Sequence, residues 1–472
     1  MRGNERTRRG VAANRPNDVQ NPPKVRGRTR ARSTSDAPGT RERAQGRGAG
    51  RSIVGVMPIS KAAARGITDE FARRRGPKTG LVVGATWGDR VLTAALEALM
   101  PADRLTVVAD PASIEDLRES LAAEGSWTAG NVTAVAALAD AEPAEEVMLA
   151  APVTVEAEAF IADIELLREK VEPGGVLSFA ATLTAPAREE IAELVAEYGI
   201  GTDLIVRSLP PVRIHRLRIG SASKHEGEPR AIAAAEGLAP AWRASSVALT
   251  RTMHLDSNGV IAAGLLLGTA WAAKKIRPSS KAWVLPALAA VPVAAFFRDP
   301  QREADLRGED DEPEAVLAAS DGRVMAVETV VDERFGAATG AAGSEWLRIA
   351  VFLSVTDVHI NRAPVAGEVV DVFTEKGGYA KVATPEAEHN AACYTVLATP
   401  RGRVVAAQRT GAVLRRIVNR SKPGASVAKG ERYGLIRFGS RTDVYLPAGA
   451  AEAAVTVGET VRAGETVIAR WR

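Results

Sequence analysis

The chain has 472 residues, of which 46% are hydrophobic, so two or three packed domains are expected. Its one cysteine, Cys393, excludes an internal disulfide and a cysteine metal cluster, and we expect a buried structural thiol there, as suits the cytosolic side of a membrane. The net charge of +4 is unevenly placed: residues 1–51 hold thirteen Arg and one Lys against four acids, a net +10, so the remainder carries −6 and shows no nucleic-acid signature.

Residues 1–51 are rich in Arg, Gly and Pro and hold almost no large apolar side chains. Such a segment cannot bury enough surface to offset its ordering entropy, so we expect a disordered basic tail. It is not a secretory signal, because no apolar stretch follows the charges. A merely solvated tail, attraction to anionic lipid and contact with RNA all stay open as its role.

Apolar runs alternate with helical patterns over residues 52–220. This alternation predicts a doubly wound, Rossmann-like α/β domain with a parallel sheet. A glycine turn follows its first strand, and an acid ends its second. The expected strands are 81–84, 105–110, 146–150 and 171–179, and the expected helices are 90–100 and 156–171.

This order resembles that of a class I S-adenosylmethionine-dependent methyltransferase. In that family the glycine turn lies against the methionine part of the cofactor and the acid binds its ribose hydroxyls, which implies Gly84, Gly88 and Asp110 here. The turn reads Gly-Ala-Thr-Trp-Gly, with the bulky Trp87 where a tighter pattern is usual. A working S-adenosylmethionine site and a structural or regulatory relic are both open.

Residues 221–258 are polar and then helical, and we expect a linker there. Residues 259–297 hold two apolar stretches, 259–273 and 282–297, with three lysines and an arginine between them. Each stretch has about 15 residues, fewer than the roughly 20 that a spanning helix needs, and two prolines interrupt the second. We therefore expect a membrane-associated hairpin that is re-entrant or interfacial; two core helices of a soluble domain are the alternative.

Residues 298–472 are β-rich with short turns, which predicts a β-rich domain. Segments 427–434 and 455–465 echo each other, because both place a Gly-Glu turn beside valine-bearing runs. They resemble the hammerhead hairpins of lipoyl-type domains. No lysine stands in the exposed carrier position, so we interpret these lipoyl-like hairpins as scaffold.

A Gly-Ser pair, Gly439-Ser440, lies between two β-rich runs near the C-terminus. Gly439 permits left-handed backbone angles and leaves its own carbonyl unshielded beside the Ser440 hydroxyl. A hydroxyl held there can attack that carbonyl and convert the amide into an ester. Elimination from the ester leaves dehydroalanine, which hydrolysis converts into a pyruvoyl group and ammonia. An isolated Gly-Ser pair is more often an ordinary turn, so the surrounding motifs decide.

Four motifs in one order make the chain resemble the phosphatidylserine decarboxylase family, and most of all its shorter bacterial and archaeal branch. The resemblance covers residues 259–472. The motifs are FFRDP at 296–300, SDGRV at 320–324, FLSVTDVHINRAP at 352–364 and FGSR at 438–441.

The resemblance implies that Ser440 is the precursor of a pyruvoyl group, which serves as the cofactor. Cleavage after Gly439 would leave a large chain, 1–439, and a small chain, 440–472. The pyruvoyl group would form a Schiff base with phosphatidylserine, whose products are phosphatidylethanolamine and carbon dioxide.

Attack by Ser440 needs a base and a group that orients the base. Of the five histidines, His359 alone stands in a strong family motif, with Asp357 two residues before it and on the same side of a strand. By the resemblance, Asp321 of the Ser-Asp-Gly turn supports self-cleavage. We therefore predict Asp321, His359 and Ser440 as the processing set, with His359 also a candidate for handling the proton of decarboxylation. Asp357 is either catalytic or an orienting residue.

Arg362 stands where many relatives carry a second histidine. Either His359 serves both self-cleavage and the proton transfer of decarboxylation, or Arg362 holds the substrate carboxylate or phosphate. The loop Ala387-Glu388-His389-Asn390 keeps two residues of a four-residue family element and is interpreted as a headgroup contact. No metal site is expected.

The sequence thus predicts a proenzyme at the cytoplasmic face of the cell membrane, peripheral or monotopic, with phosphatidylserine and anionic membrane lipids as partners. No specific nucleic-acid partner is expected, and homo-oligomerisation is left open. The alternatives are a degenerate membrane scaffold and a bifunctional lipid decarboxylase and methyltransferase.

Overall fold

The computed structural model describes residues 59–219, 229–306, 314–335, 345–382, 384–412, 416–437 and 439–472. The predicted basic tail at 1–51 lies outside the described residues. The first part of the expected linker, residues 221–228, and Phe438 of the Phe-Gly-Ser-Arg motif lie outside them as well. Predictions for these positions stay predictions.

Residues 59–219 alternate strands and helices, as expected. The strands are β1 (Thr79–Val83), β2 (Arg104–Val108), β3 (Val132–Val135), β4 (Ala144–Leu149), β5 (Val171–Thr182), β6 (Gly199–Ile205) and β7 (Val212–Arg218). The helices are α1 (Lys61–Arg73), α2 (Arg90–Glu97), α3 (Ile114–Ala123), α4 (Ser126–Asn131), α5 (Ala157–Arg168) and α6 (Arg188–Tyr198), with a 3-10 turn η1 (Leu138–Asp140).

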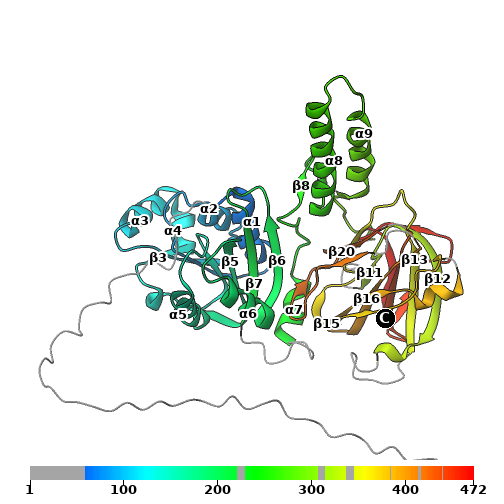
Figure 1. Cartoon of the computed structure of the whole chain (residues 1–472). Helices are drawn as coiled ribbons and strands as arrows, with labels where there is room; N and C mark the ends of the chain where they lie inside the picture. Colours follow the sequence, from blue (N-terminus) through cyan, green and yellow to red (C-terminus); the bar gives the residue numbers. More distant parts are fainter. Residues whose placement is uncertain are drawn as a thin grey trace, which may run out of the picture. The chain divides into compact units, whose positions relative to one another are not determined.

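The sheet has the order β3-β2-β1-β4-β5-β7-β6. Its strands β3, β5, β7 and β6 are labelled in Figure 1. Its strand order reverses between β1 and β4, which is the switch point of a doubly wound sheet. The predicted Rossmann-like domain is therefore confirmed. The prediction of a parallel sheet fails at one edge, because β7 runs antiparallel to both β5 and β6.

Buried apolar runs place helices on both faces of this sheet. Val82 of β1 packs in a cluster with Ile67 of α1 and apolar residues of α2 and α3. Its neighbours Leu81 and Val83 point to the opposite face, where they pack with residues of α5 and α6 such as Phe160. Burial on both faces explains why β1 reads as a continuous apolar run.

The described part of the expected linker is not a plain connection. It holds α7 (Pro229–Glu236), β8 (Val247–Ala248) and β9 (Met253–Leu255). β9 pairs antiparallel with β10 (Arg298–Pro300), which follows the apolar hairpin in the chain. The two ends of the hairpin are therefore tied together by strand pairing, which the polar composition of the linker did not reveal.

The predicted apolar hairpin consists of α8 (Ser257–Ile276) and α9 (Val284–Phe296), which lie side by side (Figure 1). α8 has 20 residues because it continues through two lysines, so the expectation of a helix too short to span is wrong. It is the one helix among the described residues that could cross a membrane by length and composition. Leu265, Trp271 and Leu285 are 69%, 66% and 77% exposed, which is not the environment of core helices.

The C-terminal part is β-rich, as predicted, and antiparallel. Its largest sheet has the order β19-β15-β16-β17-β21-β13-β12-β23, and two three-stranded sheets have the orders β14-β20-β18 and β11-β24-β22. The bounds are β11 (Ala315–Leu317), β12 (Gly322–Val331), β13 (Glu345–Phe352), β14 (Ile360–Arg362), β15 (Gly367–Glu375), β16 (Ala392–Thr399), β17 (Gly402–Arg409), β18 (Ile417–Asn419), β19 (Ser426–Val427), β20 (Arg432–Ile436), β21 (Arg441–Pro447), β22 (Ala451–Ala453), β23 (Thr460–Val461) and β24 (Val467–Trp471), with 3-10 turns η3 (Glu333–Phe335) and η4 (Pro385–His389).

The two echoing Gly-Glu turns pack on each other. A Cβ built on Gly430 would lie 3.8 Å from the Cα of Gly464. This contact joins the start of β20 to the segment before β24, and the lipoyl-like character of the two hairpins stays a prediction. Cys393 on β16 is a buried free thiol, as predicted.

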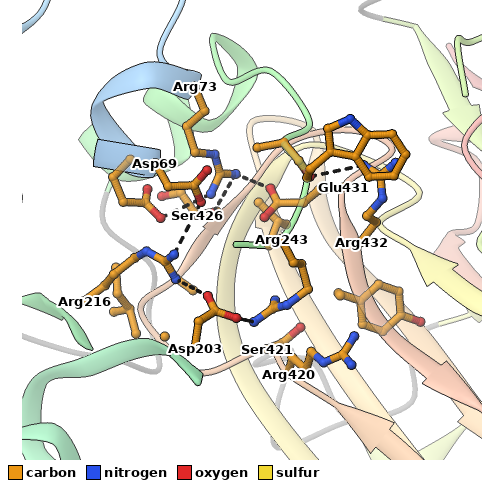
Figure 2. A pocket seen from close by; sticks show the side chains of 18 residues that line it. Asp69, Arg73, Asp203, Arg216, Arg243, Arg420, Ser421, Ser426, Glu431 and Arg432 are labelled. Carbon is orange, nitrogen blue, oxygen red and sulfur yellow. Dashed lines mark hydrogen bonds and ion pairs between the residues drawn. The ribbon is translucent and has the colours of Figure 1, made fainter. Parts of the chain in front are cut away.

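Buried ion pairs join α1 and the Rossmann-like sheet to the start of β20 (Figure 2). Arg73 at the end of α1 pairs with Glu70 at 3.3 Å and with Glu431, the residue before β20. Arg216 of β7 pairs with Asp203 of β6 at 2.9 Å. These side chains surround a cavity of about 60 Å³, enough for one or two waters.

Candidate active site

The Gly-Ser pair lies in the connection between β20 and β21. Gly439 has a φ of +66°, in the left-handed region that glycine tolerates. Ser440 is fully buried, and its Oγ has no hydrogen-bond partner within the described part of the chain. The N–H of Leu353 donates to the Ser440 carbonyl at 3.0 Å. A buried hydroxyl without a partner costs folding free energy, and at Ser440 this hydroxyl belongs to the residue directly after the Gly439 carbonyl.

Gly411 packs directly on the Gly439 carbonyl, which is the carbonyl that Ser440 would attack. A Cβ built on Gly411 would lie 1.6 Å from the Gly439 oxygen, so no other residue fits without a backbone shift. Gly411 follows β17 and lies 28 positions before Gly439 in the sequence. Sequence analysis missed it, because one glycine after a strand is an ordinary turn signal.

His359 is buried just before β14. Its Nδ1–H donates to the backbone carbonyl of Asp357 at 2.9 Å, and because a carbonyl only accepts, Nε2 is the nitrogen left to take up a proton. The ring of Phe296, at the end of α9, lies 4.2 Å from the His359 ring. Burial lowers the pKa of His359 below its ordinary 6.5, although the hydrogen bond to Asp357 opposes this shift. His359 is thus neutral at pH 7 and suited to act as a base.

Asp321 holds the turn that precedes His359. Its carboxylate accepts hydrogen bonds from the N–H of Ala463 at 2.8 Å and from Arg302 at 2.9 Å, and the N–H of Val358 faces the carboxylate. Burial raises the pKa of Asp321, and the positive charge of Arg302 and the N–H of Val358 partly offset that effect. The carboxylate therefore acts on the backbone beside His359 in this arrangement.

The three segments of the predicted processing set meet here. Ser320, beside Asp321, shares a hydrogen bond of 2.6 Å with Thr442 of β21, and Ile360 pairs with Leu435 of β20. The side chains of Ser440 and His359 are not hydrogen-bonded to each other, since Ser440 Oγ has no partner among the described residues. Proton transfer between them therefore needs either a side-chain movement or one bridging water.

Asp357 and Arg362 both have local partners. The segment around Asp357 is a turn and not the strand we expected, and its carboxylate accepts a hydrogen bond from the N–H of Ser354 at 2.7 Å. This contact favours the orienting role. Arg362 is buried, donates to Asp299 at 2.9 Å and to the carbonyl of Pro300 at 2.7 Å, and these contacts do not favour substrate binding. Its substrate role stays a prediction.

The predicted S-adenosylmethionine residues lie at exposed strand ends. The N–H of Gly84 donates to the carbonyl of Val108 at 2.8 Å, so the glycine turn and the end of β2 are adjacent, as the resemblance requires. The carboxylate of Asp110 accepts a hydrogen bond from the N–H of Ala112 at 2.9 Å. Gly88 ends the turn, after the exposed Trp87. Cofactor binding by Gly84, Gly88 and Asp110 stays a prediction.

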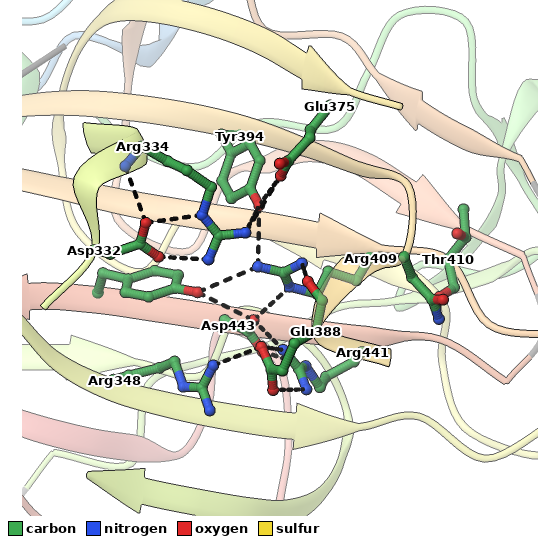
Figure 3. Close-up of polar contacts among 12 residues, drawn as sticks. Asp332, Arg334, Arg348, Glu375, Glu388, Tyr394, Arg409, Thr410, Arg441 and Asp443 are labelled. Atoms are coloured by element: carbon green, nitrogen blue, oxygen red, sulfur yellow. Dashed lines mark hydrogen bonds and ion pairs between the residues drawn. The ribbon is translucent and has the colours of Figure 1, made fainter. Parts of the chain in front are cut away.

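A network of arginines and carboxylates surrounds the residue after Ser440 (Figure 3). Arg441 donates twice to Glu388, at 2.7 and 2.9 Å, and Arg348 donates to the same carboxylate at 2.8 Å. Asp443 is fully buried and accepts from Arg441 and from Arg409, both at 2.8 Å. Although partial burial opposes it, these arginines lower the pKa of Glu388 to about 2. Sequence analysis missed this network, because its members come from four separate strands and turns.

The residues around Ser440 fit a pyruvoyl group formed from it. The hydroxyl that would be lost makes no hydrogen bond within the described part of the chain, and the carbonyl that would be kept is already bound by Leu353. Among the described residues, no group of three His, Cys, Asp or Glu side chains is placed to hold a metal ion.

Comparison with solved structures finds methyltransferases. The mitomycin 7-O-methyltransferase MmcR is 17% identical with a TM-score of 0.27, over 34% of this chain and 53% of that one. The precorrin-6y C5,15-methyltransferase from Geobacter metallireducens is 18% identical with a TM-score of 0.27, over 36% of this chain and 95% of that one. These scores are too low to support a function.

Comparison with families and curated proteins matches the C-terminal part. The family model described as phosphatidylserine decarboxylase matches residues 291–469. The phosphatidylserine decarboxylase proenzyme of Mycobacterium tuberculosis (strain ATCC 25618 / H37Rv) is 42% identical over 187 residues, 39% of this chain and 77% of the relative. That of Desulfotalea psychrophila is 39% identical over 175 residues, 37% of this chain and 76% of the relative. With this identity over three quarters of these relatives, the chain belongs to the phosphatidylserine decarboxylase family.

Proposed function

We propose that the chain is a self-cleaving proenzyme that converts phosphatidylserine into phosphatidylethanolamine and carbon dioxide. One observation carries the proposal: Ser440 is buried, its hydroxyl has no partner within the described residues, and it follows a glycine in the left-handed conformation. The family of the chain supplies the substrate class, and the contacts around Ser440 supply the roles below.

Cleavage begins when Ser440 Oγ attacks the carbonyl carbon of Gly439 and its proton passes to Nε2 of His359. The C–N bond between the two residues breaks, the nitrogen of residue 440 takes up a proton, and an ester joins Gly439 to Oγ. Loss of the Cα proton of residue 440 then expels the Gly439 carboxylate and leaves dehydroalanine. Water converts that group into a ketone and releases ammonia.

We assign Asp321 and Asp357 to positioning. Asp321 fixes the N–H of Val358, and Asp357 fixes the N–H of Ser354. Both contacts set the backbone of the turn that carries His359. The base therefore depends on two carboxylates that act through the main chain.

The mature enzyme would use the ketone on residue 440 to condense with the substrate amine and take up the electrons of the broken C–C bond. The Leu353 N–H, 3.0 Å from the Ser440 carbonyl oxygen, would stabilise negative charge that develops on that oxygen. We assign His359 the return of a proton to the substrate carbon.

We place this chemistry at the cytoplasmic face of the cell membrane, with the α8–α9 hairpin lying at the lipid interface. Leu265, Leu285 and Leu288 give the hairpin an exposed apolar surface, and Lys274 lies 5.3 Å from the ring centroid of Trp283 near its tip. At the other end, Phe296 contacts His359, so the hairpin reaches from the lipid to the base. Sedimentation with anionic vesicles tests this, and Leu265→Glu with Leu285→Glu should abolish binding.

The test of the main proposal is Ser440→Ala in the full chain. Purified wild-type protein should show a small chain of residues 440–472 on a denaturing gel, and the variant should stay whole and inactive. Ser178→Ala is the matched control, because Ser178 is equally buried and its hydroxyl also has no partner among the described residues. It should cleave normally. A whole, active wild-type chain would overturn the proposal.

A further inference from the structure

We propose that Glu388 is a positioning residue for self-cleavage, and that the segment from Glu388 to Asn390 holds the Gly439–Ser440 bond from both sides. The inference rests on the proposed function and goes beyond it. Sequence analysis interpreted this segment as a headgroup contact. Its contacts in the structure point instead to the bond that is cut.

Glu388 holds the C-terminal side of the bond. Its two carboxylate oxygens accept from the two terminal nitrogens of Arg441, at 2.7 and 2.9 Å, a bidentate pair with fixed geometry (Figure 3). Arg441 follows Ser440 directly. The carboxylate of Asp443 pairs with the same guanidinium, with Oδ1 2.7 Å from Nε and Oδ2 2.8 Å from Nη2. The backbone nitrogen of Arg441, to which the future pyruvoyl group would stay attached, is thus anchored through its own side chain.

Asn390 holds the N-terminal side of the bond. It is buried, and its amide donates to the carbonyl of Thr410 at 2.9 Å. The N–H of Thr410 in turn donates to the carbonyl of Ala391 at 3.0 Å. These bonds fix the chain leading into Gly411, which rests against the Gly439 carbonyl. One short segment, from Glu388 to Asn390, therefore helps to fix the positions of both the attacked carbonyl and the attacking residue.

Ser440 attacks the carbonyl of the residue directly before it, so the rate depends on how the hydroxyl and that carbonyl are aligned. A displacement of about 1 Å can cost about 10²-fold in rate. Glu388 is well suited to set that alignment without being needed for folding. Its side chain is 36% exposed, and glutamine at this position keeps the size of the side chain and an oxygen that can accept from the arginines. Removing it should therefore slow cleavage while leaving the fold intact.

The test follows cleavage of the full chain over time in a cell-free translation, with Glu388→Gln, Arg441→Lys and a matched control, Glu386→Gln. Glu386 lies on the same turn, two residues away, and is exposed. We expect appearance of the small chain to slow about tenfold or more for Glu388→Gln and Arg441→Lys, since both lose the charged bidentate pair. The control should cleave at the wild-type rate. The melting temperatures of Glu388→Gln and Glu386→Gln should agree closely with that of wild type, whereas Arg441→Lys also disturbs the buried pair with Asp443 and is judged by its cleavage rate alone.

The matured fraction of Glu388→Gln gives a second readout: its kcat should fall while KM is unchanged. Normal cleavage of Glu388→Gln, slowing that the Glu386→Gln control shares, or a fall in melting temperature parallel to the slowing would each overturn the inference. A raised KM with normal cleavage would also overturn it and restore the headgroup interpretation. Absence of cleavage in wild type would instead refute the proposed function, so the two failures are distinguishable.

Discussion

The two halves of the chain hold their candidate residues in different ways. In the C-terminal half, Ser440 is buried. The N–H of Leu353 donates to its carbonyl, and Gly411 packs on the carbonyl of Gly439 before it. In the N-terminal half, Gly84 and Asp110 lie at exposed strand ends; Gly84 bonds to the end of the adjacent strand, and Asp110 bonds to a residue two positions further on. The difference between the two halves is therefore burial: the C-terminal candidate is enclosed by the fold, and the N-terminal candidates face solvent.

The halves are nevertheless coupled. Glu431, which pairs with Arg73 of α1 (Figure 2), lies nine residues before Ser440, and β20 runs between the two. The Rossmann-like sheet therefore supports one end of the strand that leads to the cleaved bond. The predictions below test whether the chemistry depends on the C-terminal contacts and how far the N-terminal half contributes.

The largest effect among these predictions is expected for His359→Gln. The variant keeps a polar side chain but loses the base, so cleavage should slow by about 10²- to 10⁴-fold. A time course of small-chain formation measures it. His215→Gln is the control, because His215 is also buried but lies on β7 of the Rossmann-like sheet, and this variant should cleave at the wild-type rate. Equal rates for His359→Gln and wild type would remove His359 from the site.

Gly411→Ala should come next. The new Cβ, 1.6 Å from the Gly439 oxygen, must displace the attacked carbonyl, and cleavage should slow about 10²-fold. Gly378→Ala is the matched control, since its Cβ would meet its nearest neighbour at 3.6 Å, an ordinary contact. Normal cleavage of Gly411→Ala would show that the carbonyl position is not set here.

Acid should slow cleavage through His359. Only the neutral ring accepts the proton of Ser440, and the neutral fraction falls as the pH drops through the pKa of His359. Because burial lowers that pKa below 6.5, the rate should stay level from roughly pH 8 to 7 and fall only below pH 6.5. Stopped time courses across this range measure it. A fall that begins above pH 7 would contradict the buried, neutral histidine.

Arg73→Met should weaken the coupling between the halves. It leaves Glu431 and Glu70 without their partner in a buried site, which typically costs about 3 kcal/mol of unfolding free energy. Denaturant unfolding measures it, with the exposed Arg65→Met on the same helix as control. Equal stability of the two variants would mean that the ion pairs of Figure 2 do not join the halves.

The smallest effect is expected for Asp110→Ala, which should change cleavage and decarboxylation by less than about twofold, as for a surface site far from the chemistry. Calorimetry of the full chain with S-adenosylmethionine is the companion measurement. Heat that Asp110→Ala abolishes would turn the exposed strand ends into a working site and erase the contrast between the halves.

The sequence predicted several elements of the Rossmann-like domain well, because a continuous apolar run such as that of β1 is typical of a strand buried on both faces. It predicted β5 and α5 within a few residues of their bounds. It missed the reversed β7, since one antiparallel strand at an edge has no composition of its own. It also missed the length of α8, because two lysines hid the last helical turn.

The sequence predicted the reacting residues of the candidate site but not the residues that hold them in position. Residue type and motif predicted Ser440, His359 and Asp321, and their roles stay predictions. Gly411 was not predicted, and Glu388 was predicted only as part of a headgroup loop, because their contacts with Gly439 and Arg441 span 28 and 53 positions of sequence. The orientation of Asp357 was mistaken, because its segment folds as a turn whose carboxylate bonds to Ser354. Such partners depend on tertiary packing, which a single sequence does not display.

The most direct test of the central claim is the intact mass of purified, active wild-type protein beside Ser440→Ala. The account predicts two chains for wild type, the smaller one spanning residues 440–472 and lacking a free amine at its first residue, and one whole chain for the variant. A single unbroken wild-type chain with decarboxylase activity would contradict it.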